Sequence, residues 1–353
     1  MNLNDLRKKI DSIDGKVVKM LNERAGYSQE IGARKLKHKK GIYAPHREKE
    51  VLERLAALNE GPMPDGAFEA IYREIMSSSI ALEKPLSIAN LGIRGSYSSI
   101  AARKKFGSQI EYTSCRSIAD VFTKVENEEC DYGVVPIENS TEGAVTHTFD
   151  MLVDSELKIC SQVLLKISHN LLSKEPIDKI KKIHSNPQVF AQCRNWLLKN
   201  MPNADQIWES STTKAAEITS KQKGHAALGS VEAAEVYKLK VLKKNIQDIP
   251  HNTTRFLIIG QNDADPTGKD RTSILFSIKD KVGALYSMLQ PFYKNKINLT
   301  KIESRPSKKK AWDYYFFVDF QGHRSDTDVQ KALGQLEEMC KYLKILGSYP
   351  VLE

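Results

Sequence analysis

The hydrophobic and polar positions near the start of the chain follow the period of an amphipathic helix. Apolar residues recur every three or four positions from Leu3 to about Leu36 without a proline, so one long helix is predicted. Its apolar residues are Leu6, Ile10, Ile13, Val17, Met20, Leu21 and Ile31. Two further helices are predicted at Arg47–Leu58 and Phe68–Leu82. Two shorter helices cannot cover so long a stripe, so we expect it to pair with a second copy of the chain in a homodimer.

Beyond the third helix the pattern changes to short β-rich runs that alternate with helical stretches. Strands are predicted at Leu86–Leu91 and Tyr132–Val135, and a helix at Ile118–Val125. This alternation is typical of an α/β layer fold. A strand at Val163–Leu172 is expected to cross into another half and a strand at Ala226–Gly229 to return. The pattern therefore predicts two lobes around a cleft.

A linker at Asp263–Gly268 precedes a third pattern near the end of the chain. The elements expected there are a strand at Thr272–Ile278, a helix at Gly283–Tyr293, strands at Ile297–Ser304 and Trp312–Phe320, a helix at Asp326–Cys340 and a strand at Leu343–Leu346. This order is that of a ferredoxin-like α+β domain of the ligand-sensing ACT type. We expect three domains: all-α at 1–84, two-lobed α/β at 86–262 and ACT at 270–353.

The composition agrees with a multidomain globular protein. The chain has 353 residues, of which 41% are hydrophobic and 27% charged, and this length suits two or three domains. No apolar run is long enough to cross a bilayer and no leader begins the chain, so we expect a cytoplasmic protein with no membrane partner. Five cysteines without a Cys-x-x-Cys pair indicate reduced thiols rather than disulfides or a zinc site.

The formal net charge of +9 favours anionic partners and does not choose among them. The lysine-rich runs at 37–40 and 308–310 are typical of solvated loops. Nucleic-acid binding would require clustered Lys and Arg interleaved with aromatic residues, and no such cluster is evident.

Cations along the first helix can flank a ligand. Arg24 and Lys35 are 11 residues apart, close to three turns, so they share nearly one face. Arg7 lies 17 residues before Arg24, about 25 Å along the axis and about 100° around it. Arg7 therefore cannot share this ligand within one chain. An antiparallel dimer would bring Arg7 to the site of the other copy and create two shared sites.

Small hydroxyl and amide groups stand beside fixed charges in Pro136–Ser140 and Asn252–Phe256. Each segment follows or begins an apolar run, which is how a cleft for a small polar anion is built. Gly92–Ser98 has two glycines three apart but neither Gly-Lys-Ser/Thr nor dinucleotide spacing, so we reject nucleotide binding and expect an anion-facing helix N-terminus. His169 and His184 have no ligand cluster at metal spacing and are interpreted as structural.

These segments, together with Glu303–Pro306, closely resemble the bacterial bifunctional chorismate mutase/prephenate dehydratases over almost the whole chain. The resemblance implies rearrangement of chorismate to prephenate, decarboxylative dehydration of prephenate to phenylpyruvate, and feedback inhibition by L-phenylalanine. It implies no cofactor and no metal. The mutase pattern is met by Arg7, Arg24, Lys35, Arg47, Glu48, Ser79 and Glu83, with Arg24, Lys35 and Glu83 as catalytic residues.

The resemblance also implies residues for the other two sites. It places Asn139, Ser140, Ser185, Gln192 and Thr254 around prephenate, with Thr254 as the principal catalytic residue and Arg255 holding the turn or the anion. The phenylalanine-binding segments would be Gly283, Ala284 and Leu285 with Glu303, Ser304, Arg305 and Pro306.

Three positions depart from the family pattern: Ala44 replaces an acidic residue, Glu83 a glutamine and Ile93 a proline. Only a protonated Glu83 could donate a hydrogen bond to an ether oxygen. A non-catalytic small-molecule sensor remains the alternative reading, because two-lobed and ACT domains both serve as receptors. A sensor would have no use for the mutase cations, and Thr254 would serve it only for binding.

Overall fold

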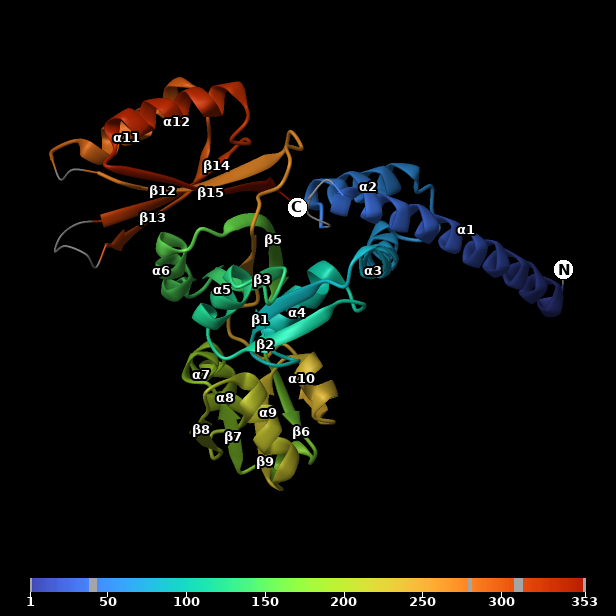
Figure 1. The fold of residues 1–353 in the computed structure, drawn as a ribbon. Coiled ribbons are helices and arrows are strands. Elements are labelled where there is room, and N and C mark those ends of the chain that lie inside the picture. Colours follow the sequence, from blue (N-terminus) through green and yellow to red (C-terminus); the bar gives the residue numbers. More distant parts are fainter. Residues whose placement is uncertain (1, 38–42, 279–280, 308–313, 352–353) are drawn as a thin grey trace. The chain divides into compact units, whose positions relative to one another are not determined.

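The computed structural model describes residues 2–37, 43–278, 281–307 and 314–351. Two compact units make up the chain: Met1–Ser87 with Lys105–Glu111, and Ile88–Lys104 with Tyr112–Glu353. Figure 1 shows their helices and strands. The lysine runs at 38–40 and 308–310 lie outside the described residues. None of the helices in the described ranges is long and apolar enough to span a membrane.

The first unit consists of helices α1 (Leu3–Lys37), α2 (Pro45–Leu58) and α3 (Asp65–Glu83), and it confirms the three helices predicted. A proline at the first position of α2 has no N–H to leave unpaired, which suits a helix start. Helix α3 packs against α1. The apolar stripe of α1 is solvent-exposed in the single chain, at Leu6, Ile10, Ile13, Val17 and Leu21 among others.

The second unit begins with two sheets, which confirms the predicted α/β lobes. The first sheet has the order β2-β1-β3-β11-β5, with β4 paired to β3, and the second has the order β10-β6-β9-β7-β8. The strands of the first sheet are β1 (Ser87–Leu91), β2 (Glu111–Cys115), β3 (Tyr132–Asn139), β4 (Gly143–Ala144), β5 (Lys158–Lys166) and β11 (Thr253–Gly260). Those of the second are β6 (Asn170–Ser173), β7 (Lys182–Ser185), β8 (Asp205–Trp208), β9 (His225–Gly229) and β10 (Lys240–Lys243).

Helices accompany both sheets. The first lobe contains α4 (Tyr97–Phe106), α5 (Ile118–Glu126) and α6 (Thr146–Asp154); the second contains α7 (Pro187–Gln192), α8 (Arg194–Asn200), α9 (Thr212–Lys221), α10 (Val231–Val236) and the 3-10 turn η1 (Ile177–Lys179). Ser117 and Asp120 form a capping box at the start of α5.

The single strand predicted at Val163–Leu172 is wrong in detail. The chain leaves the first sheet where β5 ends at Lys166 and enters the second where β6 begins at Asn170. The three residues between them belong to neither sheet, because a strand cannot pair in two separate sheets without a break. The return strand is correct, since β9 pairs with β6.

The C-terminal domain has the predicted ferredoxin-like order. Its elements are β12 (Asp270–Ser277), α11 (Ala284–Lys294), β13 (Leu299–Pro306), β14 (Tyr314–Gln321), α12 (Thr327–Met339) and β15 (Tyr342–Pro350), and its sheet order is β13-β14-β12-β15. Trp312, where the second hairpin strand was expected to begin, lies outside the described residues.

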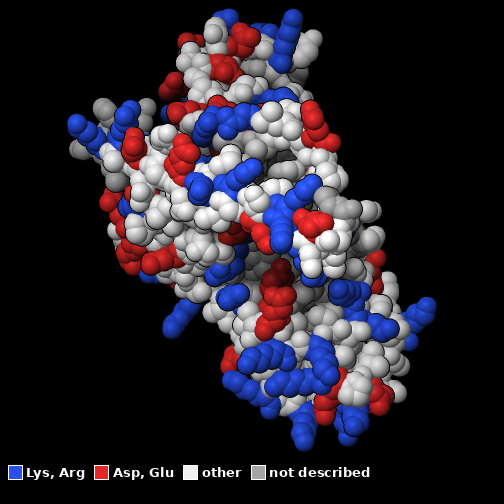
Figure 2. Space-filling model, turned by 90° about the vertical axis from the view of Figure 1, so that its right-hand side faces the viewer, with Lys and Arg blue, Asp and Glu red and all other residues white. Residues whose placement is uncertain are grey.

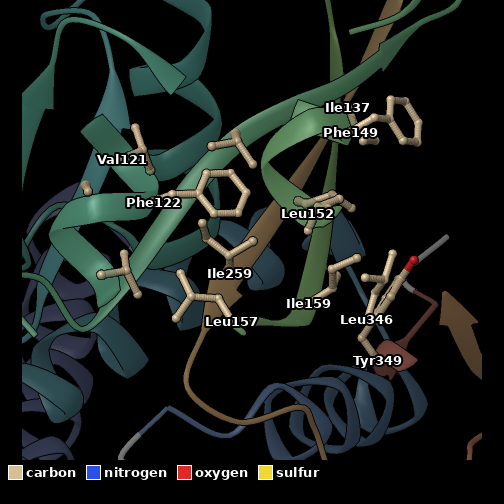
Figure 3. Packing of buried hydrophobic residues seen from close by; sticks show 14 of the residues in the cluster. Val121, Phe122, Ile137, Phe149, Leu152, Leu157, Ile159, Ile259, Leu346 and Tyr349 are labelled. Carbon is tan, nitrogen blue, oxygen red and sulfur yellow. The ribbon is translucent and has the colours of Figure 1, made fainter. Parts of the chain in front are cut away.

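The C-terminal sheet shares a hydrophobic core with the first lobe. Tyr349 and Leu346 from β15 are buried in one cluster with Phe149, Leu152 and Ile159, and Figure 3 shows these side chains together. Strand β15 also packs against β5. Because a continuous core resists separation, the C-terminal domain and the first lobe form one packed body.

Gly347 marks the closest approach of β15 to β5. Its φ is 152°, and a Cβ added there would lie 2.2 Å from the carbonyl oxygen of Ile159. Only a residue without a side chain fits, because the atom that would be struck belongs to the backbone and not to a flexible side chain.

We therefore expect Gly347→Ala to destabilise the second unit by about 1–3 kcal/mol, the usual cost of overpacking. Thermal or urea unfolding would measure the loss. The matched control is Gly334→Ala in α12, where an added Cβ meets nothing within 4 Å. That control should be neutral or slightly stabilising in a helix. Equal stability of Gly347→Ala and the wild type would contradict the close approach.

Candidate functional sites

The helical unit contains a pocket of about 840 Å³ that collects most of the predicted mutase residues. Six of the seven line it: Arg24, Lys35, Arg47, Glu48, Ser79 and Glu83. Its lining includes six Arg or Lys and three Glu side chains, an excess of three positive charges that suits a dianion. Arg7 is not among the lining residues, in agreement with its distance along α1.

Two polar contacts join α1 to α3 across this pocket. Arg24 Nη1 donates to Ser79 Oγ at 2.5 Å, and Lys35 Nζ lies 3.2 Å from Glu83 Oε2. Gly32 allows this approach, because a Cβ there would lie 2.7 Å from Cβ of Glu83. Arg24 pairs with a neutral hydroxyl in these contacts, so its charge remains available to an anion, whereas Lys35 is partly neutralised.

Glu48 has two partners that the sequence did not reveal. Its Oε2 lies 2.8 Å from Lys105 Nζ and accepts from Tyr43 Oη at 3.2 Å. Lys105 is buried and comes from the segment that follows the start of the α/β pattern, so no local periodicity connects it with the pocket. Arg47 pairs with Glu50 at 2.7 Å on the exposed rim.

In the α/β lobes, Thr254 and Asn139 lie together, as the sequence analysis expected. Asn139 Nδ2 donates to Thr254 Oγ1 and to Asn252 Oδ1, both at 2.7 Å. Antiparallel pairing of β11 with β3 sets the two residues opposite each other. Asn139 thus uses the Thr254 oxygen as an acceptor, which leaves the hydroxyl proton to be donated elsewhere.

Gln192 from the second lobe joins this group. Its Nε2 donates to Glu142 Oε1 at 2.9 Å, and its Oε1 accepts from Asn252 Nδ2 at 3.3 Å. These bonds connect α7 with the loop after β3 and with the start of β11. The polar groups of two lobes therefore meet at Thr254.

His169 orients Gln192, a role that the sequence analysis missed. Its Nε2 lies 2.7 Å from Gln192 Oε1 and its Nδ1 lies 3.0 Å from Tyr97 Oη. Since an amide oxygen only accepts, Nε2 carries the proton, and the single hydroxyl proton of Tyr97 faces two acceptors, Nδ1 and the Ser168 carbonyl at 2.7 Å. Burial lowers the pKa of His169, and the bond to Gln192 opposes this only in part. The histidine lies in the break between β5 and β6, a position that strand prediction had covered.

Two other predicted residues have structural partners. Ser140 bonds the backbone of β11 through Thr253, with Thr253 N donating to its Oγ at 2.9 Å. Ser185 is fully buried and donates to the Leu228 carbonyl at 3.2 Å, so no described bond joins it to Thr254. His184 bonds Glu209 and His225 through its two ring nitrogens.

Arg255 faces away from Thr254. Its side chain is 6% exposed, and its guanidinium bonds Asp319 at 2.7 Å and Tyr349 Oη at 2.7 Å in the C-terminal domain. Successive residues of a strand point to opposite faces, so Arg255 cannot share the ligand of Thr254. Of its two expected roles, holding the turn fits this geometry better than holding the anion.

The two segments expected to bind phenylalanine lie at the same end of the C-terminal sheet. Strand register aligns Ser277 with Tyr315 and Tyr315 with Arg305, so the segment that leads into α11 and the end of β13 are separated by one strand. Gly283 has a φ of 75° and precedes α11, with Ala284 buried and Leu285 partly exposed. Ser304 and Pro306 are exposed on β13, an edge strand, whereas Glu303 and Arg305 are partly buried.

The glycine-containing turn at Gly92–Ser98 supports the two lobes. Ser230 Oγ of the second lobe donates to the Gly95 carbonyl at 2.7 Å, and Tyr97 Oη reaches the Ser168 carbonyl. Helix α4 starts at Tyr97, within this segment, as the expected helix N-terminus requires. All five cysteines are free thiols, and the described ranges hold no group of three potential metal ligands.

Fold and sites together define an enzyme with a cation-lined helical domain, a two-lobed α/β domain and a C-terminal ACT domain. Family models agree: Chorismate mutase type II matches residues 6–84, Prephenate dehydratase 88–264 and ACT domain 272–338. The chain belongs to the bifunctional chorismate mutase/prephenate dehydratase family, which makes it an isomerase and a lyase.

Individual relatives extend over the full chain. It is 47% identical to the bifunctional chorismate mutase/prephenate dehydratase of Aquifex aeolicus, over 99% of this chain and 98% of the relative. Identity to the Neisseria gonorrhoeae enzyme of the same name is 42%, over 98% and 96%. The crystal structure of prephenate dehydratase from Arthrobacter aurescens in complex with L-Phe matches with a TM-score of 0.71, at 31% identity, over 75% of this chain and 90% of that one.

The lowered pKa of His169 predicts a pH-dependent stability. An unfolded histidine, with a pKa of about 6.5, takes up a proton before the buried one does. The contribution is therefore fully present above that value and is lost as pH falls from it towards the folded pKa. We expect His169→Asn to lower the unfolding free energy at pH 8 but to weaken its decline between pH 7 and pH 5.5. Parallel pH profiles of urea unfolding for wild type and variant would contradict this assignment.

Proposed function

We propose that the helical domain converts chorismate to prephenate and that the two-lobed domain converts prephenate to phenylpyruvate, within L-phenylalanine biosynthesis and under feedback inhibition by phenylalanine. The observation that carries the proposal is the hydrogen-bonded group of Thr254, Asn139, Asn252 and Gln192, drawn from both lobes. Domain boundaries at residues 84–86 and 262–270, a homodimer and a cytoplasmic location belong to the same proposal.

The mutase step needs orientation and charge rather than acid or base. Chorismate is a dicarboxylate ether, and its rearrangement forms one carbon–carbon bond while breaking the ether bond. Arg24 and Lys35 would hold the carboxylates and stabilise negative charge on the departing ether oxygen, with Ser79 fixing Arg24. Glu83, held by Lys35, would have to be protonated to donate to that oxygen.

The dehydratase step removes carbon dioxide and the ring hydroxyl of prephenate. The bond to the carboxylate breaks, its electron pair enters the ring, and the hydroxyl leaves as water after accepting a proton. Thr254 is suited to donate to the leaving hydroxyl, because Asn139 already donates to its oxygen. Asn139, Gln192 and Ser140 would hold the side-chain carboxylate; substrate would replace the bonds that Gln192 makes with Glu142.

A nucleic-acid partner finds no support in the charge distribution. On the face drawn in Figure 2, Lys and Arg side chains are interspersed with Asp and Glu, although the chain has an excess of basic residues. Nonspecific nucleic-acid binding needs a continuous basic surface. Anionic metabolites in local pockets are the partners that this pattern favours.

Phenylalanine is proposed to bind between Gly283–Leu285 and Glu303–Pro306. The prephenate dehydratase of Arthrobacter aurescens has been solved with L-Phe, and the two segments here lie at one end of the C-terminal sheet. Gly283 would let the amino-acid backbone of the ligand come close. Edge strand β13 would place this site at a dimer interface.

Thr254→Ala should separate the two activities. Chorismate consumption should continue, prephenate should accumulate, and the dehydratase kcat should fall about a hundredfold or more, since a positioned proton donor is lost. Ultraviolet assays of chorismate loss and phenylpyruvate formation, with and without phenylalanine, measure this. Thr253→Ala is the matched control, because it removes a hydroxyl from the neighbouring position on the opposite face of β11. Full phenylpyruvate formation by Thr254→Ala would refute the assignment.

Mixed dimers test the shared mutase site. Arg7→Ala and Arg24→Ala chains should each be inactive as mutases, because each homodimer lacks one cation in both sites. A refolded equimolar mixture should regain about a quarter of the wild-type activity, since half the dimers are mixed and each has one intact site. A mixture of Lys8→Ala and Arg24→Ala chains is the control; it should show about half of the wild-type activity, because Lys8→Ala chains keep both cations and Lys8 lies off the apolar stripe. No recovery in the first mixture would show that Arg7 does not complete the partner's site.

A further inference from the structure

Every strand of the C-terminal sheet contributes one polar side chain to a largely buried cluster at its junction with the first lobe. The four residues are Ser273 of β12, Lys301 of β13, Asp319 of β14 and Tyr349 of β15. Their partners in the first lobe are Arg255 and Glu138. We name these six residues the Arg255 cluster.

Arg255 is the centre of this cluster. Its Nε donates to Gln162 Oε1 at 2.9 Å, its Nη1 to Asp319 Oδ2 at 2.7 Å and Glu138 Oε1 at 3.1 Å, and its Nη2 to Tyr349 Oη at 2.7 Å. Ser273 Oγ closes a ring of contacts by donating to Asp319 Oδ1 at 2.6 Å and lying 2.7 Å from Tyr349 Oη. All three guanidinium nitrogens are thus bonded to protein groups, and the side chain has little room to move.

Charge complementarity holds the cluster. Burial alone would lower the pKa of Arg255, but Tyr349, Asp319 and Glu138 together raise it, so the side chain stays cationic. Burial likewise would raise the pKa of Glu138, but Lys301 and Arg255 lower it. A charge buried in this way keeps its geometry, because loss of any one partner leaves the others uncompensated.

The first-lobe members of the cluster are direct chain neighbours of the candidate catalytic pair. Glu138 precedes Asn139 at the end of β3, and Arg255 follows Thr254 at the start of β11. The register of β11 on β3 pairs Thr254 with Asn139 and Arg255 with Glu138. A shift of the Arg255–Glu138 pair must therefore move the Thr254–Asn139 pair, since each pair shares its two backbone segments.

The cluster also continues into a segment expected to bind phenylalanine. Lys301 and Glu303–Pro306 belong to the same strand, β13. At about 3.3 Å per residue along a strand, Lys301 lies about 7 Å from Glu303 and about 17 Å from Pro306. A displacement of β13 by ligand would reach Glu138 through Lys301 without crossing a flexible loop.

We propose that Arg255 is a positioning residue of the dehydratase step, and that the Arg255 cluster carries the state of the C-terminal sheet to Thr254 and Asn139. The inference rests on the proposed function, because it specifies how phenylalanine at that sheet acts on prephenate turnover. It assigns Arg255 no contact with substrate.

Arg255→Lys tests the positioning role. A lysine keeps the charge but cannot bond Gln162, Asp319 and Tyr349 at once. We expect the dehydratase kcat to fall about tenfold or more through misplacement of Thr254, with little change in KM. Because mutase activity belongs to the other unit, an unchanged urea unfolding midpoint of the second unit serves as the check that the variant is folded. A raised KM with unchanged kcat would instead place Arg255 at the substrate and overturn the proposal.

Lys301→Met and Tyr349→Phe test the transmission. Lys301→Met removes the contact with Glu138, and Tyr349→Phe removes the hydroxyl contacts with Arg255 and Ser273, each with small loss of volume. Each should raise the phenylalanine concentration for half-inhibition about fivefold or more. The matched control is Lys331→Met on α12, whose lysine is exposed and pairs only with Asp328 among the described contacts. An unchanged half-inhibition concentration in both cluster variants would refute transmission through the cluster.

Failure of the proposed function has a different signature. A wild-type protein that does not consume prephenate would reject the dehydratase assignment, and the cluster proposal with it. A wild type that turns over prephenate but ignores phenylalanine would reject the transmission half, whereas the kcat of Arg255→Lys would still decide the positioning half.

Discussion

The second unit depends on the accommodation of one buried cation between two sheets. An unpaired guanidinium in a protein interior is strongly unfavourable, and the structure meets this cost with two carboxylates, a phenol and an amide around Arg255. Two of these partners, Asp319 and Tyr349, lie in the C-terminal domain. The first lobe alone would thus expose Arg255 with half its bonds unmade. The apolar contacts of Tyr349 and Leu346 complete this junction.

The two lobes of the α/β domain are held in place by different kinds of contact. The first lobe is joined to the C-terminal sheet by a continuous core, whereas the second lobe is joined to the first by hydrogen bonds such as Ser230 to Gly95 and Gln192 to Glu142. Hydrogen bonds exchange with water or ligand more readily than a packed core separates. Substrate entry is therefore expected to displace the second lobe, and regulation to act on the first.

Sequence patterns predicted those parts of the fold in which the hydrophobic period along the chain determines the secondary structure. The long helix follows from its apolar stripe, and the ACT assignment follows from the order of the strands and helices predicted after the linker. The break between β5 and β6 was missed because residues 163–172 are apolar enough to read as one strand, and only the separate pairing partners reveal the break. His169, which lies in this break, was consequently interpreted without its contact to Gln192.

The candidate site residues also differ in how far the sequence alone could place them. Thr254, Asn139 and Gln192 were expected together from the family resemblance and lie together, whereas Arg255 was expected to hold either the turn or the anion. Strand alternation could have placed the two on opposite faces. It could not have identified the partner face, because Asp319 lies 64 residues further along the chain. A charged residue next to a catalytic one on a strand is therefore better regarded as a candidate for the support behind the site than for the site itself.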